Sequence, residues 1–213
     1  MNGIIQELKC LLKTKSIGTD SDRALLLDFQ ATLETKPEKA IKLEKDALAQ
    51  IETITVDNAR LVSNLHANLG GLYRMNGHPD LAREHMEKSI SLLDQFNLLH
   101  INDSIPQIAN YAMFLTEQQE PERGISELQK LSGIIKEYHS DDCLDYAKVQ
   151  ETLGTIYLMT ANLPQAKTHF KRAFKIYEKI WADEPEMIEA KYQEIQELYP
   201  QIGFCIGKNL SGL

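Results

Sequence analysis

The sequence contains an internal repeat with a period of 42 residues. The segments LGGLYRMNGHPDLAREHMEKSI (69–90) and LGTIYLMTANLPQAKTHFKRAF (153–174) align directly and lie 84 residues apart. A third copy at 111–132 occupies the midpoint between them, and a weaker copy occupies 27–48. A fixed period of about 20 to 50 residues is typical of chains that stack one supersecondary unit repeatedly. The repeat therefore predicts a stack of similar units.

Each copy has the pattern of two helices joined by a short turn. Apolar residues recur at steps of three and four, as in Leu153, Ile156 and Tyr157. A proline opens each second helix, where its missing N–H has no partner to lose. Small residues recur 42 apart at two places, so that helix backbones can cross closely. These two series are Ala40, Ala82, Gly124, Ala166 and Asp28, Gly70, Ala112, Gly154, with Asp28 as the misfit.

We therefore expect an all-α fold without strands. The predicted helices are 2–14, 21–34, 37–53, 58–76, 79–96, 104–118, 121–138, 142–161, 164–182 and 185–199. They group into four units at 21–62, 63–104, 105–146 and 147–182. Because a stack of repeats exposes an apolar face at each end, a capping helix is expected at 183–200. Residues 1–20 are either a half-repeat that caps the other end or part of a longer chain that continues upstream, and 201–213 form a tail.

The repeat resembles the tetratricopeptide repeat (TPR). The resemblance rests on the pattern L-G/A-x-x-Y followed by A-x-x-x-F/L/M-x-x-A, which the copies at 69–90 and 153–174 fit best. The usual TPR has about 34 residues, so a period of 42 is similar to the longer repeats of kinesin light chains and of many bacterial TPR proteins. The resemblance implies a right-handed α-solenoid, a superhelix in which the first helix of each unit lines a concave groove. It also implies a protein–protein interaction module that binds a peptide or partner segment in that groove, as the sensor or scaffold part of a larger bacterial protein.

The predicted groove contains a possible ladder of amide side chains. Asn68 and Asn110 occupy equivalent positions 42 residues apart. An amide can bond both the N–H and the C=O of an extended ligand backbone, so the two residues would grip a peptide. The alternative is that these are ordinary solvated residues. The predicted peptide-binding residues are Asn64, Asn68, Arg74, Met75, Asn110, Met113, Lys148, Thr152, Thr155 and Met159, and the first unit adds the apolar Leu25, Leu26, Phe29 and Leu33.

The sequence leaves a second function open. The chain could be a structural scaffold that forms a homo-oligomer, with the groove empty or filled by its own C-terminal tail. Exposed apolar segments tend to find a partner, and the tail carries Ile202, Phe204, Ile206 and Leu210.

Enzyme chemistry has no support in the sequence. GxSxG, GxxxxGK[ST] and GxGxxG are all absent, and the six histidines form neither HxxxH nor HExxH. We therefore predict no catalytic residue, no metal site and no cofactor. The net charge of −8 disfavours nucleic acid as a partner and favours a neutral or basic protein or peptide.

The cysteines and the apolar stretches bear on where the chain resides. The three cysteines form no CxxC pair and are predicted to be reduced thiols of a cytoplasmic protein. No stretch reaches the 18 or so apolar residues that a membrane helix requires, so no membrane association is expected.

Overall fold

A computed structural model describes residues 18–102, 104–198 and 200. All regular secondary structure in these ranges is helical, as predicted, and none of their helices is long and apolar enough to cross a membrane. The predicted helix 2–14 and the tail 201–213 lie outside the described residues. The described helices are α2 (Asp20–Thr32), α3 (Pro37–Leu48), α4 (Ala59–Met75), α5 (Pro79–Gln95), α6 (Ser104–Glu117), α7 (Pro121–Tyr138), α8 (Leu144–Met159), α9 (Leu163–Ile180) and α10 (Pro185–Leu198).

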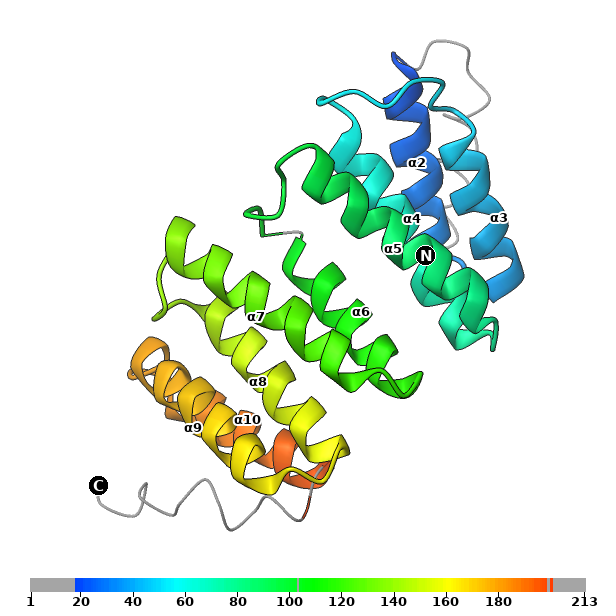
Figure 1. Cartoon of the computed structure of the whole chain (residues 1–213). Helices are drawn as coiled ribbons and strands as arrows, with labels where there is room; N and C mark the ends of the chain where they lie inside the picture. The colour runs from blue at the N-terminus through cyan, green and yellow to red at the C-terminus, as the bar shows by residue number, and fades with distance from the viewer. Residues whose placement is uncertain (1–17, 103, 199, 201–213) are drawn as a thin grey trace. The chain divides into compact units, whose positions relative to one another are not determined.

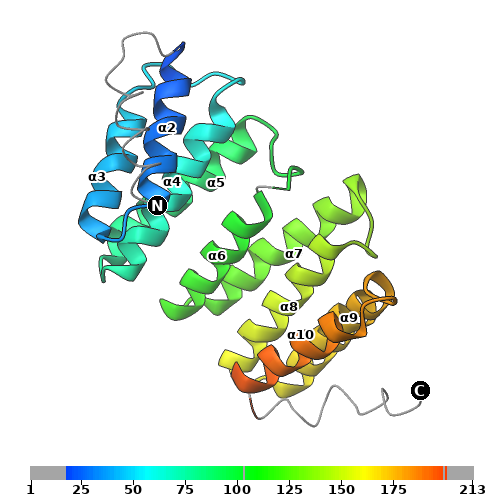
Figure 2. The ribbon, with the colours of Figure 1, turned by 180° about the vertical axis from the view of Figure 1, so that it is seen from behind.

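Consecutive helices pack as hairpins. The most extensive contacts are those of α2 with α3, α4 with α5 and α8 with α9 (Figure 1). Contacts of α3 with α4 and of α7 with α8 join one hairpin to the next, and α10 packs on α9. The chain divides between Tyr111 and Ala112, inside α6, into two units. The first holds α2 to α5 and the start of α6, and the second holds the rest of α6 to α10 (Figure 2).

The turns of the hairpins α4–α5, α6–α7 and α8–α9 share one backbone conformation. Gly77, Gln119 and Ala161 lie 42 residues apart and have φ values of 73°, 66° and 58°. Glycine adopts this left-handed region without steric cost, whereas Gln and Ala do not. Each hairpin then starts its second helix with proline in the first two positions, as the sequence predicts. Pro164 is shifted by one residue relative to the other prolines, so it is the second residue of α9, which begins at Leu163.

The recurring small residues lie where helices cross. A Cβ on Gly124 of α7 would come within 2.6 Å of the carbonyl oxygen of Ala112, and a Cβ on Gly154 of α8 would come within 2.8 Å of the Phe170 ring. Real carbon atoms do not approach so closely, so a larger side chain would separate the helices. The packing explanation for the repeated small residues is confirmed at both places.

One predicted helix is too long. The expected helix 37–53 ends at Leu48, because the following residues include the β-branched Ile51, Thr53 and Ile54, which favour helix weakly. The chain turns after Leu48, and Ile51 packs against the small core formed by Ala24, Ala47 and Leu65. Burial of this side chain against the core thus replaces one more turn of helix.

Candidate protein-interaction surface

The first helices of unit 1 present an apolar face. Leu25 and Phe29 lie one turn apart on α2 and are 54% and 48% exposed. On α4, a Cβ added to Gly71 would meet nothing within 4 Å, and Met75 is 82% exposed. Gly71 and Phe29 are equivalent positions of successive repeats, and α2 contacts α4. This face therefore combines large exposed apolar side chains with open backbone.

Asn68 makes hydrogen bonds within the chain. Its Nδ2 donates to Asp28 Oδ1 at 2.8 Å and to Glu44 Oε1 at 3.2 Å. Asp28 comes from α2, Glu44 from α3 and Asn68 from α4, so the amide joins the first hairpin to the next helix. Both amide hydrogens are engaged here, which removes the donors that the predicted peptide ladder requires of Asn68.

The two carboxyl groups beside Asn68 are perturbed by burial. Glu44 is 2% exposed, and its Oε2 is buried with no hydrogen-bond partner in the described part of the chain. Burial, reinforced by the neighbouring Asp28, raises the pKa of Glu44 to about 8. Burial also raises the pKa of Asp28. Glu44 therefore keeps its proton at neutral pH, which avoids two adjacent negative charges in a low-dielectric site.

Asn110 lies in a different environment from its repeat equivalent. Its side chain is exposed. The positions 42 residues after Asp28 and Glu44 are Gly70 and Met86, which offer no side-chain acceptor for an amide hydrogen. The two asparagines occupy the same position in the repeat, but only Asn68 has carboxyl acceptors at the neighbouring positions.

Asn64 also contributes to packing within unit 1. Its Oδ1 accepts a hydrogen bond of 2.5 Å from Nε2 of Gln107 on α6. The Oε1 of Gln107 accepts from Ser63 at 2.9 Å and from Ser89 at 2.6 Å, and both serines are fully buried. This network satisfies the polar groups inside the unit, because each buried donor finds an acceptor.

The predicted site residues on α8 lie in unit 2, and two of them, Lys148 and Met159, are exposed. Lys148 is exposed and forms an ion pair of 3.8 Å with Asp145. The hydroxyl of Thr152 donates to the Lys148 carbonyl at 2.9 Å, Thr155 is half-buried, and Met159 is 46% exposed. In unit 1, Arg74 is also half-buried.

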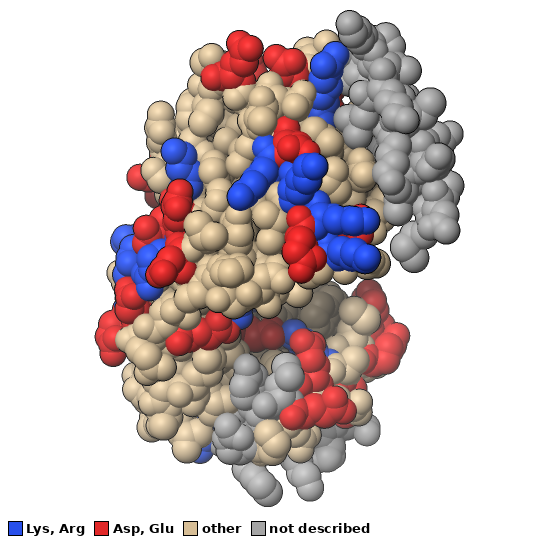
Figure 3. Space-filling model, turned by 90° about the vertical axis from the view of Figure 1, so that its right-hand side faces the viewer, with Lys and Arg blue, Asp and Glu red and all other residues tan. Residues whose placement is uncertain are grey.

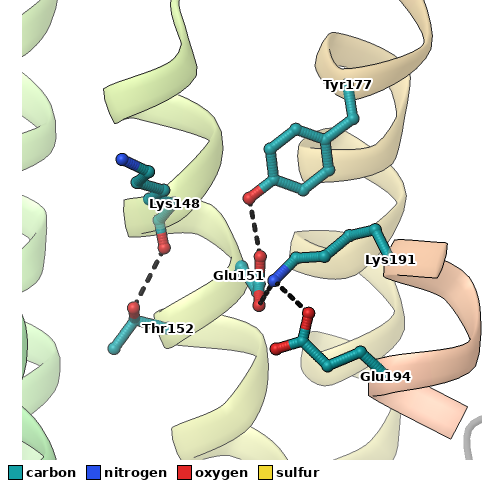
Figure 4. A network of polar contacts seen from close by, with 6 residues as sticks. All are labelled: Lys148, Glu151, Thr152, Tyr177, Lys191 and Glu194. Carbon is teal, nitrogen blue, oxygen red and sulfur yellow. Dashed lines mark hydrogen bonds and ion pairs between the residues drawn. The ribbon is translucent and has the colours of Figure 1, made fainter. Parts of the chain in front are cut away.

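A charged network attaches α10 to α8 and α9. Lys191 Nζ lies 2.8 Å from Glu151 Oε1 and 3.0 Å from Glu194 Oε2 (Figure 4). The Tyr177 hydroxyl donates to Glu151 Oε2 at 2.6 Å, and the Tyr192 ring stacks on Phe174 at 4.1 Å between centroids. The side chains of Lys191 and Glu151 are about one-fifth exposed. These contacts hold α10 against the last hairpin and engage Glu151 of α8.

A stacked tyrosine and histidine occur in both units. Tyr73 stacks on His85 at 5.5 Å, and their equivalents 84 residues later, Tyr157 and His169, stack at 5.2 Å. A polar partner completes each pair, because His66 Nδ1 lies 2.8 Å from His85 Nδ1 and Gln150 Oε1 lies 2.9 Å from His169 Nδ1. Sequence reasoning missed this motif, although the 84-residue spacing of the tyrosines and histidines carried the signal.

Burial disfavours protonation of the histidine pair of unit 1. Burial, with a smaller contribution from the charge that His85 can carry, lowers the pKa of His66 to about 4, and burial lowers the pKa of His85. The pair borders an open cavity of about 270 Å³, which is large enough for one apolar side chain. The cavity is lined by Leu48, Ile51, Ile54, Val62, His66, Glu84, His85 and Lys88. No group of three His, Cys, Asp or Glu in the described residues could hold a metal ion.

Comparison with known proteins identifies the repeat. Residues 104–179 match the tetratricopeptide repeat family model, and no curated protein matches the chain. The structure of BtubC (BKLC) from P. vanneervenii has a TM-score of 0.73 at 19% identity, covering 93% of this chain and 80% of that one. A putative kinesin light chain of P. anserina with nearly identical TPR-like repeats has a TM-score of 0.69 at 15% identity, with coverages of 85% and 90%. MamA follows with a TM-score of 0.58 at 15% identity and coverages of 84% and 89%.

The described helices have the all-α fold of tetratricopeptide repeat proteins. The all-α TPR fold and the likeness to kinesin-light-chain-type repeats, both predicted from the sequence, are confirmed. At these identities the structural likeness shows the fold alone. The TPR fold supports a module for protein–protein interaction, and TPR proteins are generally non-enzymatic scaffolds.

Proposed function

We propose that this TPR protein binds an extended segment of a partner protein on the first-helix face of unit 1, formed by α2 and α4. The observation that carries the proposal is the exposure of Leu25 and Phe29 side by side on α2. Large apolar side chains grouped on a surface mark interaction sites more often than single ones do. Burying one such side chain contributes about 1.5 to 3 kcal/mol.

The spacing of this pair suggests the form of the ligand. Residues four apart on a helix rise about 6 Å along its axis. In an extended chain, residues two apart point the same way and lie about 6.6 Å apart. A segment with two apolar side chains separated by one residue would therefore match Leu25 and Phe29. The net charge of −8 favours a segment that is neutral or basic.

The other residues of the predicted groove divide into two groups. Met75 in unit 1 and Met113 in unit 2 each suit an adaptable surface because the thioether side chain is flexible, and the exposed Asn110 of unit 1 retains an amide for the ligand backbone. We assign Asn64 and Asn68 to packing instead. In unit 2, Lys148, Thr155 and Met159 are proposed contacts on the equivalent face of α8.

The test is selection of peptides from a random display library on the purified chain, followed by calorimetry. Peptides with alternating apolar residues should bind with micromolar affinity and lose at least about tenfold in Leu25→Glu/Phe29→Glu. The matched control is Val56→Glu/Leu163→Glu, which replaces two other exposed apolar residues and should leave binding unchanged. Equal loss in both variants, or no selected peptide, would overturn the proposal.

The scaffold alternative predicts a different result. A homo-oligomer whose groove is filled by its own tail would sediment as more than one chain. A variant ending at residue 200 would then change its oligomeric state or gain peptide binding. A full chain that sediments as a monomer and binds the selected peptides at full strength would exclude this alternative.

A further inference from the structure

The outer face of α9 carries a row of unpaired lysines. Lys167, Lys171 and Lys175 lie four residues apart, so they share one side of the helix, and all three are exposed. Within the described part of the chain, none of the three ammonium groups forms a hydrogen bond or an ion pair. The row rises about 12 Å along the helix axis.

The row leads into a basic cavity of unit 2. The cavity has a volume of about 260 Å³ and lies between α8, α9 and the end of α7. Four of its lining side chains are basic and two are acidic, and one of the acids is already paired with Lys179. The Lys136 ammonium lies 5.2 Å from the centroid of the Tyr146 ring. The lining residues are Lys136, Asp141, Asp142, Tyr146, Arg172, Lys175, Ile176 and Lys179.

This local charge is unusual for the chain. The protein as a whole has a net charge of −8. Unit 1 also displays lysines on α3, but Figure 3 shows acidic groups among the basic ones on that face, and Glu38 and Asp46 lie on the same helix. On α9 the only acidic residue is Glu178. The α9 face is therefore a concentrated positive surface on an acidic protein.

We propose that the outer face of α9 and its adjoining cavity bind an acidic segment of a partner protein. The surface is separate from the first-helix face of unit 1 and does not depend on ligand binding there. Three lysines over about 12 Å match acidic side chains that repeat every second residue of an extended segment, which are about 6.6 Å apart. The cavity then receives the carboxylate that follows the row. Arg172 Nη1 donates to Gln150 Oε1 at 3.4 Å, and its other guanidinium N–H groups remain to bond that carboxylate.

A protein segment fits this surface better than nucleic acid does. Nucleic-acid binding draws on a large basic surface, because affinity comes from releasing many counterions. Here the unpaired basic side chains are few. Asp141, which lines the cavity, would repel a phosphate backbone that continued past it. A short acidic segment can end before it reaches this carboxylate.

The test uses fluorescence anisotropy with a labelled twelve-residue peptide of alternating Glu and Ser. A Gln-Ser peptide, a twelve-nucleotide single strand and vesicles containing anionic lipid serve as comparison probes. The Glu peptide should bind the full chain at low salt. Affinity should fall about tenfold in Lys167→Gln/Lys171→Gln/Lys175→Gln, because each exposed charge pair contributes modestly. The control, Lys36→Gln/Lys39→Gln/Lys42→Gln, removes the same charge from α3 and should change affinity less than about twofold.

Four results would overturn the proposal. One is the absence of Glu-peptide binding at low salt, and another is equal loss of affinity in the α3 and α9 variants, which would indicate unspecific attraction. A third is binding of the oligonucleotide or the vesicles that is tighter than binding of the Glu peptide and is lost in the α9 variant. That result would show that the surface binds nucleic acid or an anionic membrane instead. The fourth is salt-sensitive self-association that the α9 variant abolishes, which would assign the surface to a second copy of the chain.

Discussion

The side-chain amide of Asn68 donates a hydrogen bond of 2.8 Å to the carboxyl group of Asp28, 40 residues earlier in the chain. With its second bond to Glu44, Asn68 connects three helices of unit 1. Asp28 occupies the position that is small in the other repeats, and its carboxyl group gives Asn68 a structural role that Asn110 does not share.

The first prediction concerns this amide. Asn68→Ala removes the donor to two partly or fully buried carboxyl groups and should lower the free energy of unfolding by about 1 to 3 kcal/mol. Asn110→Ala changes an exposed side chain and should stay within about 0.5 kcal/mol of the wild type. Urea denaturation followed by circular dichroism measures both. A small and equal effect of the two substitutions would return Asn68 to the role of a ligand contact.

The second prediction concerns Glu44 and alkaline pH. In the folded chain this carboxyl group keeps its proton up to about pH 8, whereas in the unfolded chain it ionises near 4.5. The unfolded state therefore binds fewer protons between these values, and stability falls as the pH rises through this window. Glu44→Gln removes this titration. As the pH rises from 4.5 to 8, the free energy of unfolding of the variant should increase by about 2 to 4 kcal/mol relative to that of the wild type.

Urea denaturation at pH 4.5 and pH 8 checks the expected gain of the Gln variant. The informative quantity is the difference between the two pH values, because it cancels any constant effect of the substitution. A difference that does not change with pH would show that Glu44 ionises normally in the folded protein.

The third prediction concerns His66 and acidic pH. Its pKa in the folded protein is about 4, below the ordinary value of 6.5. The unfolded chain takes up a proton first as the pH falls, so stability contributed by neutral His66 is lost between pH 6.5 and pH 4. His66→Gln copies the Gln150 and His169 pair of unit 2 and cannot take up that proton.

The difference in free energy of unfolding between the variant and the wild type should therefore shift by about 1 to 2 kcal/mol in favour of the variant between pH 8 and pH 5. Thermal unfolding at the two pH values measures this, with His139→Gln, an exposed histidine, as the control. Parallel loss of stability in wild type and variant on acidification would contradict the assignment.

The fourth prediction compares two glycines of the same helix. Gly124→Ala places a methyl group 2.6 Å from the Ala112 carbonyl oxygen, so α7 must shift and stability should fall by about 1 to 3 kcal/mol. A Cβ on Gly133 meets nothing within 4 Å. Gly133→Ala should therefore stabilise α7 by about 0.5 to 1 kcal/mol, because alanine favours helix over glycine. Guanidinium denaturation of the two variants is sufficient, and a loss at Gly133 as large as at Gly124 would contradict the crossing geometry.

The sequence by itself determined the architecture of the described repeats. Apolar spacing, the prolines and the recurring small residues are local or periodic signals, and they predicted the described helices, with most boundaries within two residues. They also predicted close backbone approach at Gly124, since only a residue without a side chain fits there. The end of α3 at Leu48 was missed, because burial of Ile51 against residues from α2 and α4 is a tertiary effect.

Only the tertiary structure decided the roles of the individual polar residues. Asn68 and Asn110 are identical in type and register, and they differ because Asp28 and Glu44 approach one of them from other helices. The same holds for Glu151 of α8, whose partner Lys191 comes from α10, 40 residues later in the sequence. Periodicity fixes which face a side chain occupies, whereas its partner, its burial and its protonation depend on which distant residues the fold brings within bonding distance.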